Sequence, residues 1–193
     1  MTLTSGFGRR IWLLGPLFLV TAQSVLGQDH TSTMPRFEDY PSGRTFTAKP
    51  AAPRIATALE QSYVDQIRNG VEKGYGVFRD GKEQVGANFA GNLIVIQWAC
   101  GAPCVRMVIV DAQTGAIYYP PISINGIGAR SFDLPLLTPK GSVPRNPDVQ
   151  FRADSDLMVI TATPGKFGLR RSYAYYFLWR QSRWAFLRKL PLD

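Results

Sequence analysis

The sequence predicts an α+β protein with a single antiparallel β-sheet of about six strands and one N-terminal amphipathic helix packed on a face. Three observations lead to this prediction. Apolar residues recur every four positions over residues 55–71, which is the spacing of a buried helix face. Six later stretches are rich in β-branched and aromatic residues, which favour strands. Two links between those stretches are short and contain turn-forming residues, as in antiparallel hairpins.

The first 27 residues have the order of a secretory signal peptide. Arg9 and Arg10 precede an apolar run from Ile11 to Ala22, and Gly27 is a small residue at a plausible cleavage point. The run is too short for a stable membrane anchor, although an uncleaved N-terminal anchor is the alternative. We expect an exported protein, periplasmic or secreted, with no membrane span in the mature chain. The expected segments are a signal peptide at 1–27, an extended lead-in at 28–52 and a single α+β domain at 53–193.

The amphipathic helix is expected to begin near Pro53, because proline suits the first turn of a helix. Either Gly70 or Gly74 should end it, since glycine is the common residue just past a helix. The apolar face must be buried, and packing on the sheet is the simplest interpretation. Its residues are Ile55, Leu59, Tyr63, Ile67 and Val71.

Six stretches are predicted to be strands. The first two are almost continuously apolar, as in strands covered on both faces. Asp111 to Gly115 has the composition of a tight turn, and Gln181 with Ser182 forms a second one. Residues 120–148 contain six prolines and three glycines, which indicates a long loop. The predicted strands are residues 93–99, 105–111, 116–119, 157–161, 173–180 and 183–190.

Two cysteines, Cys100 and Cys104, lie between the first two predicted strands. An oxidising compartment favours a disulfide between them, which closes a short ring. The chain-entropy contribution of so short a ring is only about 2 kcal/mol, so its main effect is to fix a shape. A preorganised loop loses less entropy when it binds, and we therefore predict a binding site at the ring. The predicted binding residues here are Gly101, Ala102, Pro103, Trp98 and Arg106.

Two other classes of function stay open. The cysteines, with Met107 as a third soft ligand, suit an envelope thiol or copper-handling protein. A carboxylate-only enzyme acting on envelope glycans needs two acids at a defined separation, and Asp111 and residues 154–156 are better explained as turns. The only histidine, His30, lies beside the predicted cleavage site, which disfavours triads and zinc. We expect no enzyme, no metal and no cofactor.

Basic residues are concentrated near the C-terminal end. Without the first 27 residues the chain keeps 20 basic and 14 acidic residues. Arg180, Arg183 and Trp184 lie in a hairpin of alternating aromatic residues, and we predict that they contribute to binding an envelope protein or an anionic envelope polymer. Export argues against a nucleic acid as the target. The alternative is a core-facing aromatic ladder with its arginines in solvent.

A string of motifs resembles a family of uncharacterised exported bacterial proteins. That family is marked by an NFAG segment, a tryptophan before a Cys-Gly pair, and a DxxTGxxY hairpin. The resemblance covers the chain from Phe37 to about Leu187 and implies no known activity. In this sequence the motifs are Asn88-Phe89-Ala90-Gly91, Trp98-Ala99-Cys100-Gly101 with Cys104, and the segment from Asp111 to Tyr118.

The order of predicted elements is also similar, in topology, to that of periplasmic inhibitors of animal-type lysozyme. In those inhibitors a disulfide-closed loop between strands is inserted into the cleft of the enzyme. This chain has a shorter spacer between its cysteines and lacks the histidine of those inhibitors. The likeness implies an inhibitory loop at Cys100–Cys104, but fold order alone does not establish function.

Overall fold

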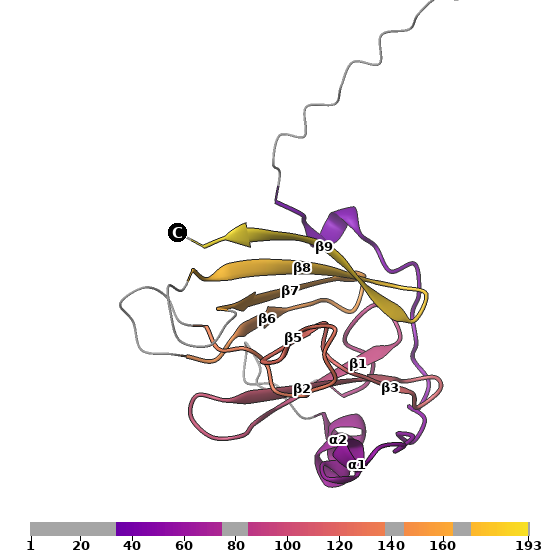
Figure 1. Ribbon diagram of the computed structural model, residues 1–193. Helices are drawn as coiled ribbons and strands as arrows, with labels where there is room; N and C mark the ends of the chain where they lie inside the picture. Colours follow the sequence, from indigo (N-terminus) through magenta and orange to yellow (C-terminus); the bar gives the residue numbers. More distant parts are fainter. Residues whose placement is uncertain (1–33, 75–84, 138–144, 164–170, 193) are drawn as a thin grey trace, which may run out of the picture. The chain divides into compact units, whose positions relative to one another are not determined.

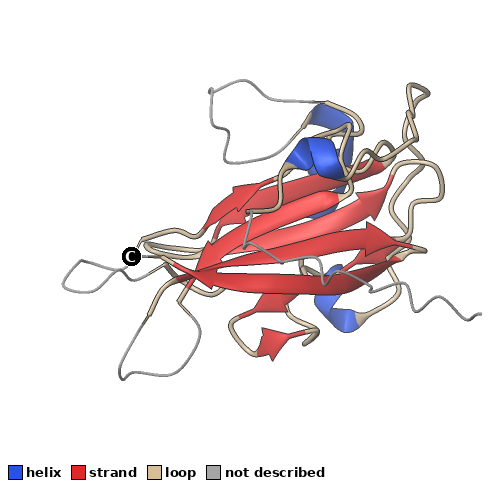
Figure 2. Ribbon diagram, turned by 90° about the horizontal axis from the view of Figure 1, so that it is seen from above, coloured by secondary structure: helices blue, strands red, loops and turns tan. Residues whose placement is uncertain are grey.

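Two antiparallel β-sheets and a short hairpin form most of the regular structure (Figures 1 and 2). This computed structural model describes residues 34–74, 85–137, 145–163 and 171–192. The predicted signal peptide and the predicted cleavage site lie outside the described residues. The α+β mixture is confirmed, with few helices and mostly antiparallel strands. The single sheet of six strands is wrong, because the strands divide into separate sheets.

The first sheet has the order β1-β2-β3. Strand β1 (Leu93–Ala99) pairs with β2 (Val105–Asp111), and the short β3 (Ile117–Tyr118) pairs with the other edge of β2. Its side chains alternate between two buried environments, with Val95 among those facing the second sheet and Ile96 among those on the helix side. Burial on both faces explains the nearly continuous apolar character of β1 and β2.

The second sheet has the order β6-β7-β8-β9. Its strands are β6 (Asp148–Gln150), β7 (Leu157–Ala162), β8 (Tyr173–Arg180) and β9 (Arg183–Pro191). Gln181 and Ser182 have φ of 51° and 58°, which is the left-handed conformation of a two-residue hairpin turn. This turn makes β8 and β9 the hairpin that the sequence predicts.

The main core lies between the two sheets. Phe89 and Met107 are fully buried from the side of the first sheet, and Phe177 and Trp179 from the side of the second. One large sheet would leave two wide apolar faces to cover, whereas two sheets bury one face of each against the other. In the sequence, residues 120–148 lie between the strands of the two sheets, and in their described part a short hairpin replaces part of the predicted loop. Its strands are β4 (Ile122–Ser123) and β5 (Gly126–Ile127).

Two helices, α1 (Ala58–Gln61) and α2 (Val64–Lys73), stand in place of the single helix expected from Pro53. Helix α1 begins later because Thr57 and Glu60 form a capping box, with Glu60 N donating to Thr57 Oγ1 at 3.1 Å and Thr57 N donating to Glu60 Oε2 at 3.0 Å. No helix in the described residues is long and apolar enough to cross a membrane.

Helix α2 packs against β1 through the predicted apolar face. Ile67 and Val71 are buried there with Ile96. Gly70 does not end the helix but lets it approach the sheet closely, because an added Cβ would overlap the side chain of Ile96. Gly74 ends it, with φ of 69°.

The segment before the helices is attached to the second sheet near residues 152–156. It contains the short helix η1 (Phe37–Asp39). The buried Ser155 hydroxyl lies 2.9 Å from the carbonyl oxygen of Phe37 and 3.0 Å from that of Tyr40, and it donates to either. Arg152 forms ion pairs with both Glu38 and Asp154. These contacts are structural, as the turn interpretation of residues 154–156 predicts.

The pKa values of two acids at this attachment, Asp154 and Asp156, are shifted in opposite directions. Hydrogen bonds from Arg152 lower the pKa of Asp154, and desolvation opposes that shift. Burial raises the pKa of Asp156, although the guanidinium of Arg44, 3.1 Å away, opposes that shift. The two acids therefore each have an arginine partner and serve to hold the lead-in segment.

Candidate functional site

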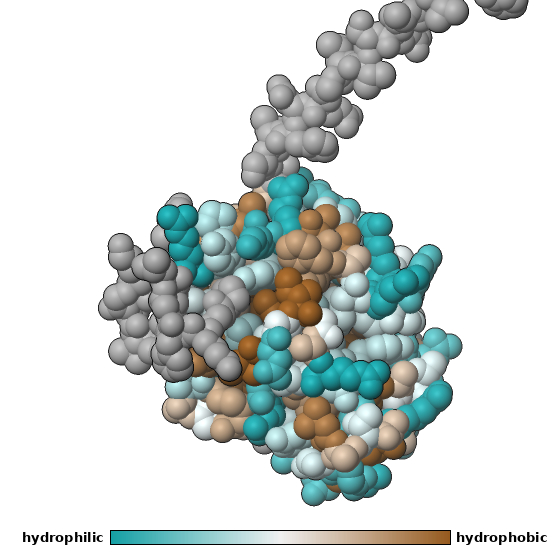
Figure 3. All heavy atoms as spheres, viewed as in Figure 1, coloured by the Kyte–Doolittle hydropathy of each residue, from teal (hydrophilic) through white to brown (hydrophobic). Residues whose placement is uncertain are grey.

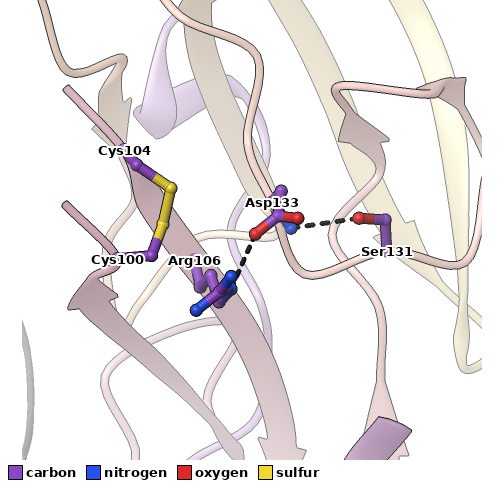
Figure 4. The surroundings of a disulfide bond; sticks show 5 residues. All are labelled: Cys100, Cys104, Arg106, Ser131 and Asp133. Carbon is purple, nitrogen blue, oxygen red and sulfur yellow. Dashed lines mark hydrogen bonds and ion pairs between the residues drawn. A yellow bond between two sulfur atoms is a disulfide. The ribbon is translucent and has the colours of Figure 1, made fainter. Parts of the chain in front are cut away.

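The five-residue ring from Cys100 to Cys104 lies at the turn between β1 and β2 (Figure 4). A disulfide joins the two cysteines, whose Cα atoms are 5.1 Å apart. Two backbone hydrogen bonds also cross the ring, from Cys100 N to Cys104 O at 3.2 Å and from Cys104 N to Gly101 O at 2.7 Å. The ring is therefore fixed by three crosslinks within five residues.

The tip of the ring is open to solvent. Gly101 and Ala102 are exposed, and Pro103, which follows a cis peptide bond, is half-buried. Gly101 has φ of 117°, and nothing lies within 4 Å of the position that a Cβ would take. Glycine is required here for the backbone conformation and not for lack of space. The tip thus presents backbone groups and small side chains without a cover from the described residues.

An arginine and an aspartate lie beside the ring (Figure 4). Arg106 Nε donates to Asp133 Oδ1 at 2.7 Å, and Ser131 Oγ accepts from the backbone N–H of Asp133 at 3.2 Å. The Arg106 guanidinium also lies over the ring of Tyr63, 4.7 Å from its centroid. The side chains of Arg106 and Asp133 keep 25% and 38% of their surface exposed, so both remain accessible next to the loop.

Trp98 lies in β1, two residues before the ring, and is almost fully buried. Only 5% of it is exposed, and its indole packs against Tyr63 at 5.6 Å and Phe132 at 6.0 Å between ring centroids. The sequence predicts Trp98 as a binding residue, but its position leaves little indole surface for a partner. Its role in the structure is to pack the end of β1 against the aromatic residues around it.

The thiol ligands proposed from the sequence are not brought together with Met107. That side chain is fully buried in the core between the sheets, where Gln97 Nε2 lies 3.7 Å from its sulfur. Asp133 takes its place, because the two cysteine sulfurs and a carboxylate oxygen of Asp133 all lie within 4.8 Å of one another. The sequence gives no signal for this neighbour, which is separated from Arg106 by 27 residues.

The basic turn predicted to assist binding lies at the other end of the strands (Figure 1). Arg180 and Arg183 are exposed at the turn between β8 and β9. Trp184 Nε1 donates to the carbonyl oxygen of Tyr119 at 2.9 Å, and its indole stacks on Phe89 before the start of β1. The disulfide-closed ring from Cys100 to Cys104, by contrast, follows the end of β1. The structure therefore does not unite the two predicted groups in one surface.

The NFAG segment has a structural role that sequence reasoning missed. The side chain of Asn88 pairs with the backbone of Val95, accepting from its N–H at 2.7 Å and donating to its carbonyl at 3.1 Å. Gly91 N donates to the carbonyl of Ala153 at 2.7 Å, and Gly91 O accepts from Phe46 N at 2.8 Å. This motif therefore joins three distant parts of the chain and contributes no reactive group.

Asp111 likewise holds a turn. Its Oδ1 accepts from the backbone N–H groups of Gln113 and Thr114, both at 2.8 Å, and its Oδ2 accepts from Asn92 Nδ2 at 3.0 Å. The turn interpretation of this acid is confirmed. Its two oxygens are engaged, so Asp111 is not placed as half of a catalytic pair.

Comparison with known proteins gives no match: no family model, curated protein or solved structure matches this chain.

Proposed function

We propose that this protein is a non-enzymatic binding protein of the cell envelope, which docks on its partner through the ring from Cys100 to Cys104. One observation carries the proposal: the tip of the ring is exposed, while three crosslinks fix its backbone. Such a loop loses little conformational entropy on binding. Export of the chain, expected from its first 27 residues, is part of the same proposal.

The sharpest form of this function is inhibition of an enzyme that cleaves cell walls. Many glycoside hydrolases hold two carboxyl groups in a cleft, and a narrow loop that enters the cleft blocks access to them. The ion pair of Arg106 with Asp133 lies next to the ring and gives the docking surface a hydrogen-bonding charged pair. The order of elements predicted from the sequence, which is similar to that of periplasmic inhibitors of animal-type lysozyme, suggests this form by analogy. An anionic wall polymer is the other partner that the basic chain suits.

Replacing both cysteines, Cys100→Ser with Cys104→Ser, is expected to weaken binding while the protein stays folded. Without the disulfide the conformational entropy of the unfolded chain rises, which lowers the free energy of unfolding by about 2 kcal/mol. The loop also loses the fixed shape on which docking depends. We expect inhibition of animal-type lysozyme in a cell-wall lysis assay to fall about tenfold or more, and the same loss in co-sedimentation with purified wall material. Urea unfolding measures the change in stability.

Gly43→Ala is the matched control for this experiment. Gly43 has φ of 61° in open space, so alanine there costs about 1–2 kcal/mol through backbone strain alone. This variant should bind as well as the wild-type protein. Equal binding by the double cysteine variant, or no binding of the wild type to either lysozyme or wall material, contradicts the proposal. Two free thiols in the denatured, unreduced protein contradict it as well.

A second function, metal handling by the reduced protein, is favoured by one specific observation. The sulfurs of Cys100 and Cys104 and a carboxylate oxygen of Asp133 lie close enough to hold one ion. Thiolates suit Cu(I) and zinc, and both metals need the thiols reduced and deprotonated. The disulfide of the present structure prevents such binding.

Metal uptake by protein reduced with a phosphine tests this second function. We expect one Cu(I) or zinc ion per molecule, lost in the double serine variant and weakened in Asp133→Asn. Met107→Leu should bind normally, because Met107 is enclosed in the core. Absence of stoichiometric uptake by the reduced wild type excludes the function. Uptake that depends on Met107 and not on Asp133 excludes the arrangement described.

A further inference from the structure

A groove opens between the β4–β5 hairpin and the last strand, β9, at a different place from the ring. Its volume is about 360 Å³. Three of its apolar side chains are unusually exposed for their type: Ile124 by 61%, Ile127 by 55% and Phe186 by 49%. In Figure 3 apolar residues gather at the centre of this face, with hydrophilic residues around them. Exposed apolar surface of this kind, with a polar rim, marks an interaction site.

Strand β9 borders the groove and ends its sheet. In the order β6-β7-β8-β9 it has a neighbour on one side only. Among the described residues its backbone pairs with β8, and beyond it Leu192 N donates to Ser172 O in the same direction. Within the described part of the chain, the outer edge of β9 therefore has backbone groups without a backbone partner. An edge of this length is a template for another strand.

Two cations accompany this edge. Lys189 lines the groove, and its Nζ lies 4.9 Å from the centroid of the Tyr173 ring. Arg183 is exposed at the start of the strand. None of the described residues that line the groove carries a carboxylate. A segment that pairs with β9 would therefore have the groove, with Lys189 at its border, on one face and Arg183 on the other.

We propose that β9 binds an extended segment of a partner protein in which acidic residues alternate with apolar ones. The segment adds a strand to the edge of the sheet, so main-chain hydrogen bonds supply much of the affinity. Its apolar side chains enter the groove against Phe186 and the β4–β5 hairpin, and its carboxylates project to the opposite face of the sheet, on the side of Arg183. This site goes beyond the proposed function, because it needs neither the ring nor the disulfide.

A second copy of this chain is a poor occupant of the same edge. Two β9 strands side by side would bring the cations of one against those of the other, and like charges across strands are destabilising. Lysine on an edge strand is a common protection against self-pairing. The charge that prevents self-association is the charge that selects an acidic strand.

Binding of synthetic peptides to the full mature chain tests the proposal. The probe is a fluorescein-labelled peptide of alternating Glu and Val, as long as β9, and anisotropy reports binding. We expect saturable binding that weakens as salt rises. A peptide with the same side chains but N-methylated along one edge should bind about tenfold more weakly, because it has lost its donors. A Lys-Val peptide should not bind, because its cations face those of β9.

Charge and groove variants localise the binding. Lys189→Glu is expected to weaken it about tenfold, and Phe186→Ser by a similar factor. Lys49→Glu, the same change at an exposed lysine of the lead-in segment, and the double cysteine-to-serine variant should bind as the wild type does. Equal binding of the N-methylated or the Lys-Val peptide overturns the proposal. So does the absence of any binding, or a dimer in light scattering that the Glu-Val peptide does not dissociate.

Discussion

Replacing Gly91 with alanine is expected to lower the free energy of unfolding by about 3 kcal/mol or more. Gly91 has φ of 74°, where a residue with a Cβ is strained, and the added atom would overlap the backbone carbonyl of Arg44. A backbone carbonyl has no rotamer by which to move away. The segment would have to shift, and the hydrogen bonds that Gly91 makes with Phe46 and Ala153 would lengthen or break. Urea unfolding followed by circular dichroism measures the change.

The Gly43→Ala variant separates the two causes. Gly43 has φ of 61°, close to that of Gly91, but no heavy atom lies within 4 Å of its Cβ position. Alanine at residue 43 should therefore cost only the strain of about 1–2 kcal/mol. Equal losses for the two variants would show that the close approach of the lead-in segment to Gly91 does not contribute to stability.

Local patterns in the sequence identify most elements of the structure. The alternating and continuous apolar runs place the β1–β2 and β8–β9 hairpins correctly. Both periodicity and turns are decided by residues that are near in sequence. The late start of α1 also has a local signal, the Thr57-x-x-Glu60 capping box. Pro53 suggests an earlier start, but the capping box is the stronger cause, since it satisfies backbone donors at the true end of the helix.

The division into two sheets has no such local signal. Periodicity shows that β1, β2, β7 and β8 are covered on both faces, but one sheet between other layers and two sheets packed together give the same pattern. The difference depends on the path of the segment that links the two sheets, of which the structure describes residues 120–137 and 145–148. Their prolines and glycines indicate irregular backbone without its direction.

The candidate sites divide in the same way. The ring follows from the spacing of two cysteines and the strands around them, which are local facts. The Asp133 carboxylate beside the ring and the groove under β9 both depend on the path of residues 120–137, and contacts so distant in sequence leave no mark in one sequence. The separation of Arg183 from the ring is a third such result, because it depends on how the sheets are aligned.

Replacing Trp179 with alanine is expected to lower the free energy of unfolding by about 3–5 kcal/mol. The side chain is only 2% exposed and lies in the core between the sheets. Its ring is 4.7 Å from that of Tyr118 in the first sheet and 4.9 Å from that of Trp184 in β9, between centroids. Its removal leaves a cavity that two aligned sheets cannot close without losing other contacts.

Phe186→Ala is the control for Trp179→Ala within the same sheet. Phe186 is half exposed, so its truncation removes less buried surface and should cost about 1 kcal/mol. Far-UV circular dichroism is the suitable probe for both variants, because the loss of an indole does not remove its signal. A cost for Trp179→Ala no larger than that of Phe186→Ala would mean that the sheets do not pack face to face at this point.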